Sequence, residues 1–491
     1  MPLRLLHLPK ELLVHVVQSV AEPEHQEDDW GSVTCCYSKD SLRALQELRL
    51  LCRTFCNIAT PVLFERVGLY PWQESRKRYG KILEDNKLRK YVRDLCVNTV
   101  DEDEEEDGSQ EDVPVEEGFV LALRRFTQFP SLNTVTLRFS SNCCSYNIDQ
   151  PWPQSANFRR PILRDVFGTL ARTSITDISL LNLQDINDEE LLGSADFQSV
   201  LTRLTSLALQ ICTEEDQAAP EHSIEIPSLH TFFPALPPTW LTPTTHTLTR
   251  LVLYSDRYAG WCPHLDPTAL HFPRLAALAL GRYTFTSAAP VDWIARHAST
   301  LRALALHDCP ILVYRVIVAP LRLQADGVSV TVPSRVGGTA RGRPPAQACQ
   351  YTDLRWAGVF SRLREEMAVL RDFRVCSAGW RRGELAAARE RVENLRNELS
   401  AERYAWFDGG YHKLNMFGVG GVLRRMREGR DSPVWREWAG FVEKCGVGMD
   451  KEQDLEDVTA LEELLAKIGM RGKGSGTETF ENYRGDKSVR F

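Results

Sequence analysis

Residues 275–280 read Leu-Ala-Ala-Leu-Ala-Leu, and residues 301–306 read Leu-Arg-Ala-Leu-Ala-Leu. Both follow the pattern apolar-x-x-apolar-x-apolar, in which the last three positions alternate as they do in a β-strand. The pattern recurs along the chain between residues 90 and 310. Its occurrences are Val92/Leu95/Val97, Leu132/Val135/Leu137, Ile175/Ile178/Leu180, Leu204/Leu207/Leu209, Leu248/Leu251/Leu253, Leu275/Leu278/Leu280 and Leu301/Leu304/Leu306.

The spacing of these segments is that of a repeat architecture. Their middle residues follow one another at intervals of 26 to 44 positions, and the shortest intervals are single-repeat lengths of leucine-rich-repeat proteins. Cys212 and Cys309 each stand three residues after the last leucine of a segment, where such repeats accept Asn or Cys. The sequence therefore predicts an α/β chain with an irregular leucine-rich-repeat-like solenoid over residues 71–330, in which each strand stacks on the previous one.

Length and charge limit the possible classes of protein. The chain has 491 residues, enough for two to four folded units, and a formal net charge of −7. Residues 101–117 hold eleven acidic residues and no base, so that the remainder carries +4. We expect this acidic tract to be a disordered loop on the solenoid, and we expect no nucleic-acid partner.

Thirteen cysteines occur without a Cys-x-x-Cys pair, which argues against a zinc knuckle or a secreted disulfide framework. We expect free thiols in a reducing compartment, the cytoplasm or the nucleus. No uninterrupted apolar run of about 18 residues is present, so we expect no membrane span. The sequence indicates no metal and no cofactor.

The composition changes after the predicted solenoid. Residues 331–352 are rich in Gly and Pro and predict a linker, residues 353–470 predict a helical region, and residues 471–491 predict a disordered tail. Helical spacing of apolar residues marks four segments in the helical region: 356–373, 385–399, 432–441 and 455–468.

Residues 1–70 predict a compact helical module. A first helix after Pro9 carries the apolar stripe Leu12, Leu13, Val16, Val17 and Val20, and a second begins near Asp40 or Ser41. Two or three short helices bury little surface by themselves. We therefore expect their apolar faces to pack on the rest of the chain or on another protein.

The module resembles an F-box. The string Leu8-Pro9-Lys10-Glu11-Leu12-Leu13 matches the opening of that motif, and Leu50-Leu51-Cys52-Arg53-Thr54-Phe55 matches its apolar-Cys-Arg-x-Trp/Phe end. The continuation over residues 58–64 is similar to fungal F-box proteins with leucine-rich-repeat-like tails. The loop over residues 21–40 is longer than the F-box usually has between its first two helices.

The resemblance implies a substrate-recruiting subunit of a Skp–cullin–F-box ubiquitin ligase, with a Skp-type adaptor and the cullin core as partners. The adaptor-binding residues that it implies are Leu8, Pro9, Glu11, Leu12, Leu13, Val16, Leu51, Cys52 and Phe55. Burying five or six large side chains at roughly 1.5–3 kcal/mol each is enough for a tight complex.

The predicted strands also suggest where a protein substrate binds. Side chains on the concave face of the later segments are small and mostly apolar, and Arg250, Tyr254 and His307 surround them. We expect either a substrate, with these residues as anchors, or the helix bearing Trp356 and Phe360 to cover this face.

Other motifs carry weaker signals. His307-Asp308-Cys309 is more typical of a turn than of a nucleophilic site, because adjacent residues do not form a catalytic triad. A metal at Cys52 and Cys56, a phosphate loop at 417–421 and a minor-groove hook at 340–344 each lack the flanking residues such sites need. We therefore expect a non-enzymatic adaptor; the alternative is an interaction scaffold with no ligase role, whose N-terminal helices cap the solenoid.

Overall fold

The computed structural model describes residues 8–21, 39–100, 117–143, 153–214, 226–317, 348–376 and 451–469, with short stretches at 322–323, 330–331, 397, 399, 403–408 and 416–418. The acidic tract lies almost wholly outside these residues, as do the tail and the helices expected at 385–399 and 432–441. The chain divides into two compact units. The first comprises 1–183, 188–209 and 381–387, and the second 184–187, 210–380 and 388–491.

Nine strands form one sheet in the order β1-β2-β3-β4-β5-β6-β7-β8-β13. The pairs β1–β2, β2–β3 and β3–β4 in the first unit, and β6–β7, β7–β8 and β8–β13 in the second, are all parallel. The strands are β1 Arg66–Leu69, β2 Asp94–Asn98, β3 Thr134–Arg138, β4 Asp177–Gln184, β5 Ser206–Cys212, β6 Arg250–Ala259, β7 Ala277–Tyr283, β8 Ala303–His307 and β13 Asp372–Cys376.

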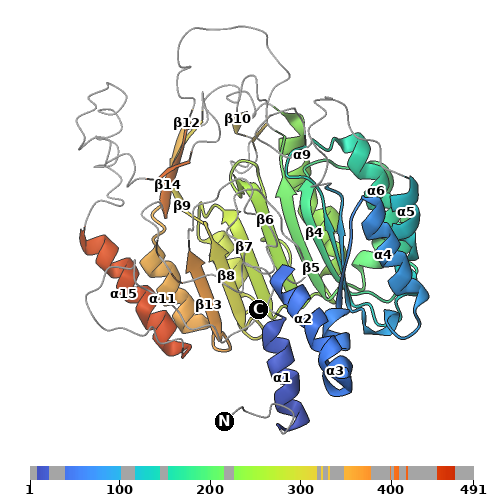
Figure 1. The fold of residues 1–491 in the computed structure, drawn as a ribbon. Coiled ribbons are helices and arrows are strands. Elements are labelled where there is room, and N and C mark those ends of the chain that lie inside the picture. Colours follow the sequence, from blue (N-terminus) through green and yellow to red (C-terminus); the bar gives the residue numbers. More distant parts are fainter. Residues whose placement is uncertain are drawn as a thin grey trace, which may run out of the picture. The chain divides into compact units, whose positions relative to one another are not determined.

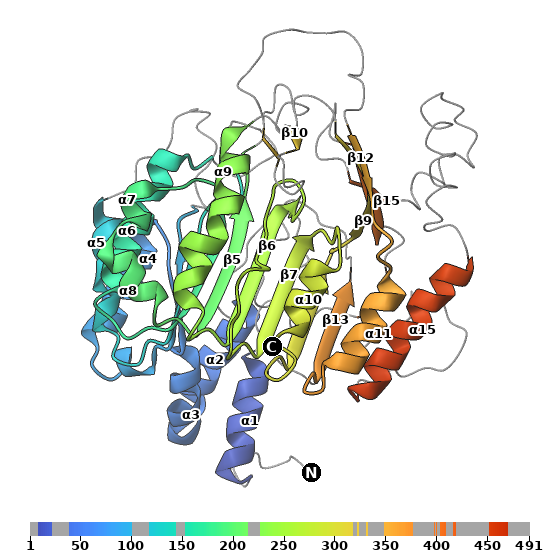
Figure 2. The same ribbon diagram turned by 180° about the vertical axis from the view of Figure 1, so that it is seen from behind.

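Helices alternate with these strands (Figures 1 and 2). They are α4 Gln73–Glu84, α5 Glu117–Leu123, α6 Ala156–Leu170, α7 Glu189–Leu192, α8 Ala195–Leu201, α9 Pro227–Leu236, α10 Ala289–Ala295 and α11 Trp356–Glu366. Shorter helical turns are η2 Arg89–Tyr91, η3 Arg124–Gln128, η5 Pro237–Leu241 and η6 Thr242–Thr244. No helix among the described residues has the length and apolar character needed to cross a membrane.

The fold is an α/β sheet, so the predicted leucine-rich-repeat solenoid is wrong. Parallel neighbours need crossover connections, and here the crossovers contain helices of very different lengths, from the 4 residues of α7 to the 15 of α6. A strand buried beneath such helices shows the same spacing of apolar residues as the strand of a solenoid repeat. The sequence pattern therefore located the strands without distinguishing the two architectures.

The seven predicted strand segments are confirmed as β2 to β8. Where the pairing of neighbouring strands is known, the middle apolar residues of their segments pair with each other: Leu95 pairs with Val135, and Leu251 with Leu278. The two outer strands carry the same pattern, as Phe64/Val67/Leu69 in β1 and Leu370/Phe373/Val375 in β13. The outer strands thus follow the rule that located the inner seven.

Between residues 311 and 418 the described residues form further strands, and three of these, β13, β14 and β15, lie within the region 353–470 that the sequence predicts to be helical. A second sheet has the order β12-β9-β14-β15, and β10 pairs with β11. These strands are β9 Ile311–Ile317, β10 Arg322–Leu323, β11 Val330–Thr331, β12 Ala348–Tyr351, β14 Tyr404–Asp408 and β15 Met416–Gly418. The helix predicted over 356–373 ends at Glu366, because the residues from Asp372 pair with β8. The last predicted helix is confirmed as α15 Lys451–Lys467, which packs on α11.

The free edge of β13 is covered by a side chain. Asn397 Oδ1 accepts the Val375 N–H at 2.8 Å, and its Nδ2 donates to the Phe373 carbonyl at 3.1 Å. The amide is buried and takes the hydrogen-bonding positions that a neighbouring strand would use.

Three helices form the N-terminal part of the first unit: α1 Lys10–Val20, α2 Lys39–Leu51 and α3 Arg53–Leu63. They pack on one another in pairs. Their shared core is apolar and consists of Leu13, Val17, Leu45, Phe55, Ile58, Ala59 and Leu63.

Candidate functional site

The N-terminal helices expose large apolar side chains. The described residues contain six exposed large hydrophobic side chains, and four of them lie on α1 and α2. Leu12 is 49% exposed, Val16 37%, Leu50 87% and Leu51 66%. Leu12 and Val16 are one helical turn apart and so share a face of α1, while Leu50 and Leu51 end α2. We call these four residues the N-terminal apolar surface.

The predicted adaptor-binding residues separate into two groups. Pro9, Glu11, Leu12, Val16 and Leu51 are exposed, and Leu8 and Cys52 are half-buried. Leu13 and Phe55 are instead buried in the core of the three helices, because such short helices need large side chains to hold them together. Sequence reasoning did not single out Leu50, although it adjoins Leu51.

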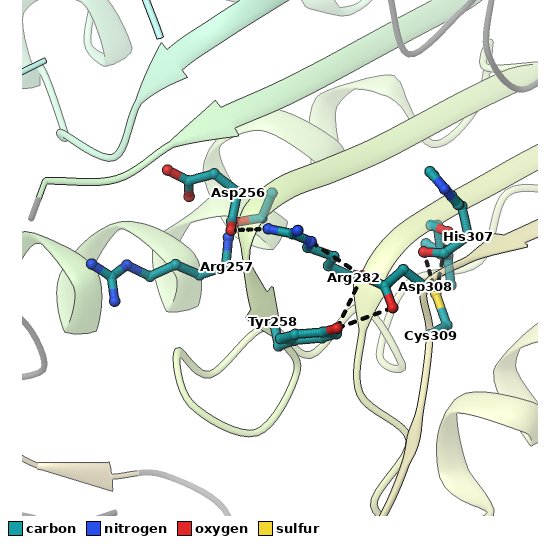
Figure 3. Close-up of polar contacts among 9 residues, drawn as sticks. Asp256, Arg257, Tyr258, Arg282, His307, Asp308 and Cys309 are labelled. Atoms are coloured by element: carbon teal, nitrogen blue, oxygen red, sulfur yellow. Dashed lines mark hydrogen bonds and ion pairs between the residues drawn. The ribbon is translucent and has the colours of Figure 1, made fainter. Parts of the chain in front are cut away.

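A second group of polar residues lies at the carboxyl ends of strands β5 to β8, within the last few residues of each strand or just after it, and Figure 3 shows those of β6 to β8. Asp256 accepts hydrogen bonds from the Thr213 N–H at 2.9 Å and from Thr213 Oγ1 at 3.0 Å. Arg257 Nε donates to the same hydroxyl at 2.6 Å. Residues at the carboxyl ends of parallel strands meet at one edge of the sheet, which is where α/β proteins commonly bind ligands.

The next two strand ends are joined by an ion pair. Arg282 Nε lies 3.3 Å from Asp308 Oδ2, and Tyr258 Oη donates to both oxygens of the same carboxylate at 2.9 and 3.0 Å. Arg282 and Asp308 hold equivalent positions in neighbouring strands, and both have left-handed backbone conformations, with φ of 53° and 52°. For a non-glycine residue this conformation costs free energy, so the surrounding contacts must hold it in place.

Two carboxyl groups near this edge have perturbed acidity. Burial raises the pKa of Asp185 well above its ordinary value, and the nearby Cys212 and Asp256 add to the effect. Burial also raises the pKa of Asp256, although Arg257 and the Thr213 hydrogen bonds oppose this. Asp185 Oδ2 accepts the Ser228 hydroxyl at 3.0 Å, but its buried Oδ1 has no hydrogen-bond partner.

The predicted substrate-binding residues are only partly accessible. Tyr254 and His307 are 2% and 3% exposed, and their ring centroids lie 5.7 Å apart across Gly281, with which both residues are in register. A Cβ atom at position 281 would overlap the Tyr254 ring. Arg250 is half-buried at the opposite end of β6. The structure thus brings two of the three together, and their contact with a substrate stays a prediction.

The small residues of the predicted concave face are buried in the middle of β7 and β8, whereas Ala277 and Ala303 at the strand starts are half-buried. Ala279 is 1% exposed and Ala305 0%. The helix α11, considered above as a possible cover, directly precedes β13 and packs beside α10, which connects β7 and β8 (Figure 2).

The described residues do not assemble a catalytic or metal centre from the motifs considered above. Cys309 Sγ is buried and donates to the carbonyls of Leu280 at 3.2 Å and His307 at 3.4 Å. In the part of the chain that the structure describes, no group of three His, Cys, Asp or Glu side chains has the arrangement of a metal site. The 417–421 and 340–344 motifs lie outside the described residues, except 417 and 418.

Comparison with known proteins identified no family. No protein-family model matches the chain, and no curated protein matches it.

Proposed function

We propose that this chain is the substrate-recruiting subunit of a Skp–cullin–F-box ubiquitin ligase. It binds a Skp-type adaptor through α1 to α3 and a protein substrate through the sheet region. The observation that supports the proposal best is the N-terminal apolar surface: Leu12, Leu50 and Leu51 lie within the two halves of the F-box-like sequence at 8–13 and 50–55, and Val16 lies one helical turn after Leu12.

The exposed side chains are not needed for the helices' own core. Leu13, Val17, Leu45 and Phe55 already fill that core, whereas Leu12 and Leu51 remain in solvent. Contiguous exposed apolar residues on a folded protein usually mark an interaction surface. Complete burial of a large aliphatic side chain contributes about 1.5–3 kcal/mol, and the gain is proportionally smaller for one already half covered. Four such side chains, two of them more than half exposed, are therefore a substantial source of binding free energy.

In this role the chain acts by proximity. A substrate held on the sheet region is brought close to the ubiquitin-charged enzyme of the ligase, which raises its effective concentration there. The polar strand ends from Thr213 to Asp308 and the half-buried Arg250 are the groups available for contacts with a substrate. No residue of this chain is required to make or break a bond.

The decisive test is co-purification of the full-length chain with a Skp-type adaptor, comparing wild type with the double variant Leu12→Asp, Leu51→Asp. Burying two unpaired carboxylates at the interface should weaken binding by about 100-fold or more. Circular dichroism and the thermal midpoint should not change, because both side chains are exposed. Leu13→Asp is not suitable, since it would disrupt the helical core.

The matched control is Leu121→Asp, which charges a leucine on α5 that is 52% exposed, close to the 49% of Leu12. It should bind the adaptor like wild type. Absence of association between the wild-type chain and the adaptor at micromolar concentrations would reject the proposal and favour an interaction scaffold with no ligase role. Equal loss of binding in the control would show that the effect is nonspecific.

A further inference from the structure

Arg315 on β9 is a buried cation for which the described part of the chain supplies no counter-ion. The residue is 9% exposed, and the Nε atom of its guanidinium is buried without a hydrogen-bond partner. Among the described residues it forms no ion pair. Its guanidinium carbon lies 4.6 Å from the ring centroid of Trp261. Burial lowers the pKa of Arg315 to about 10.

Other buried arginines of the second unit are neutralised by the chain itself. Arg374 is paired with Asp372 at 3.0 Å, and Arg403 with Asp457 at 2.8 Å. Burying a guanidinium is costly unless a counter-charge or a set of hydrogen bonds compensates it. Arg315, in contrast, has no carboxylate partner among the described residues. An anion from outside the chain would compensate its charge.

Two further unpartnered polar atoms lie in one short loop after β6. Trp261 Nε1 and His264 Nδ1 are both buried and lack hydrogen-bond partners. The indole N–H can only donate, and the imidazole nitrogen donates in one tautomer. Trp261 contacts the Arg315 guanidinium, and His264 lies in the same loop as Trp261; we call these three residues the Arg315 cluster.

The backbone around Trp261 is fixed by specific contacts. Thr284 Oγ1 accepts the Trp261 N–H at 3.0 Å and donates to the Ala259 carbonyl at 3.0 Å. Gly260 has φ of 114°, and a Cβ atom there would lie 2.7 Å from Thr284 Oγ1. Only glycine fits this close approach, so the loop is held in one conformation and Trp261 is preorganised.

The loop that carries Trp261 and the start of β9 lie beyond the carboxyl ends of neighbouring parallel strands. Trp261 follows β6, Phe285 follows β7, and Ile311 begins β9 shortly after β8, with a bridge between Phe285 and Ile311. The carboxyl ends of parallel strands are the usual position of ligands in α/β sheets. The loop bearing Trp261 and His264 therefore follows the carboxyl end of β6, and Arg315 belongs to the strand that begins shortly after β8.

We propose that the Arg315 cluster binds an oxyanion, a phosphate or a carboxylate group, through the Arg315 guanidinium and the Trp261 indole N–H. A guanidinium presents paired donors that match such oxygens, and an anion would supply the missing counter-charge. The acidic residue nearest to Arg315 in sequence is Asp308, which is already paired with Arg282 at 3.3 Å. The proposal does not depend on the adaptor-binding role of the N-terminal helices, so either can fail without the other.

The first experiment measures the thermal midpoint of the full-length chain in buffer free of phosphate and carboxylates. Arg315→Met keeps the aliphatic length and removes the uncompensated charge. Its midpoint should equal or exceed that of wild type, because a buried unpaired cation destabilises the fold. A lower midpoint would show that the chain itself satisfies Arg315, which would overturn the proposal.

The second experiment titrates inorganic phosphate, acetate and chloride at matched ionic strength. Phosphate or acetate should raise the wild-type midpoint saturably, and the anion that acts at lower concentration identifies the preferred class. Arg315→Met should lose this shift, while Arg274→Gln, which changes an exposed arginine, should keep it. An equal response to chloride, or an unchanged response in Arg315→Met, would refute the proposal.

A third variant tests the indole donor. Trp261→Phe retains an aromatic face for the guanidinium but lacks the N–H. It should shift the phosphate or acetate titration to about tenfold higher concentration, which corresponds to one lost hydrogen bond. An unchanged titration would remove Trp261 from the site and contradict the geometry proposed.

Discussion

The buried carboxyl of Asp185 provides a test of how burial acts on stability. The folded chain raises the pKa of this group above its value in the unfolded chain, so its protonated form is favoured by folding. The associated stability is complete below the unfolded pKa and is lost as the pH rises through the folded pKa. Asp185→Asn has almost the same shape and cannot ionise. It should therefore stabilise the chain at neutral pH, and increasingly so as the pH rises.

The expected size follows from the contacts of Asp185. The group is 1% exposed, accepts one hydroxyl at 3.0 Å from Ser228, and leaves Oδ1 without a partner. A buried polar atom that is left unsatisfied costs about 1–3 kcal/mol. Relief of part of that cost by the neutral amide should contribute about 1 kcal/mol, or a rise of about 2–4 °C in the thermal midpoint of the second unit.

The assay is thermal unfolding at about pH 5 and about pH 8, followed by circular dichroism. Asp188→Asn is the contrasting variant. Burial acts to raise the pKa of Asp188, but hydrogen bonds from Arg164 at 2.6 and 2.9 Å and from the Leu191 N–H lower it overall. That variant should lower the midpoint by about the same amount at both pH values, because the stability that a lowered carboxyl pKa contributes is fully present above the unfolded pKa. A lower midpoint for Asp185→Asn at about pH 8 would refute the reasoning, because it would mean that the ionised carboxylate stabilises the fold.

Gly281→Ala should destabilise the second unit by about 1–3 kcal/mol, because the new methyl group overlaps the buried Tyr254 ring. Gly358→Ala on α11, where the space is open, should be neutral or stabilising in the same thermal assay; a loss equal to that of Gly281→Ala would contradict the packing. Burial lowers the pKa of His297 to about 4. The unfolded chain therefore binds a proton at His297 below about pH 6.5 while the folded chain does not, and the free energy of unfolding should fall there by up to about 2 kcal/mol after allowance for solvent screening. His297→Gln should flatten this acid-side decline in thermal midpoints, whereas His246→Gln at an exposed position should keep it; the idea fails if both variants behave like wild type.

Part of the fold could be predicted because a buried strand has a recognisable spacing of apolar residues in the sequence. Leu278 and Leu280 lie on one side of a strand and Ala277 and Ala279 on the other, and this alternation is visible in six residues. The same apolar spacing located all seven inner strands in their correct positions. The spacing is also present in β1 and β13. The apolar residues of β13, however, continue the helical spacing of α11, so the sequence predicted one longer helix there.

The architecture itself could not be read from these patterns. A buried parallel strand has the same apolar spacing whether its connection is an irregular turn or the 15-residue helix α6. The strands of the second sheet gave no comparable signal, since β12 and β15 have only 4 and 3 residues. Their formation depends on partners distant in the sequence, such as the pairing of Gln350 with Arg315.

For the candidate site, too, the sequence predicted some features and not others. The F-box-like strings located the N-terminal helices, but the sequence could not distinguish Leu12, which is exposed, from the adjacent Leu13, which is buried. Adjacent residues on a helix differ by 100° in direction, so their exposure depends on the position of the partner helix. The Arg315 cluster was not predicted, because its members come from different segments and only the fold brings them together.

Asn397 gives the main sheet a defined end. An open outer strand is a template on which an extended peptide or a second copy of a protein can add by main-chain hydrogen bonding. On β13, the Val375 N–H and the Phe373 carbonyl are already occupied by a single amide from the same chain. A strand from another molecule could therefore add to this edge only after displacing that amide, so a single side chain opposes growth of the sheet beyond β13.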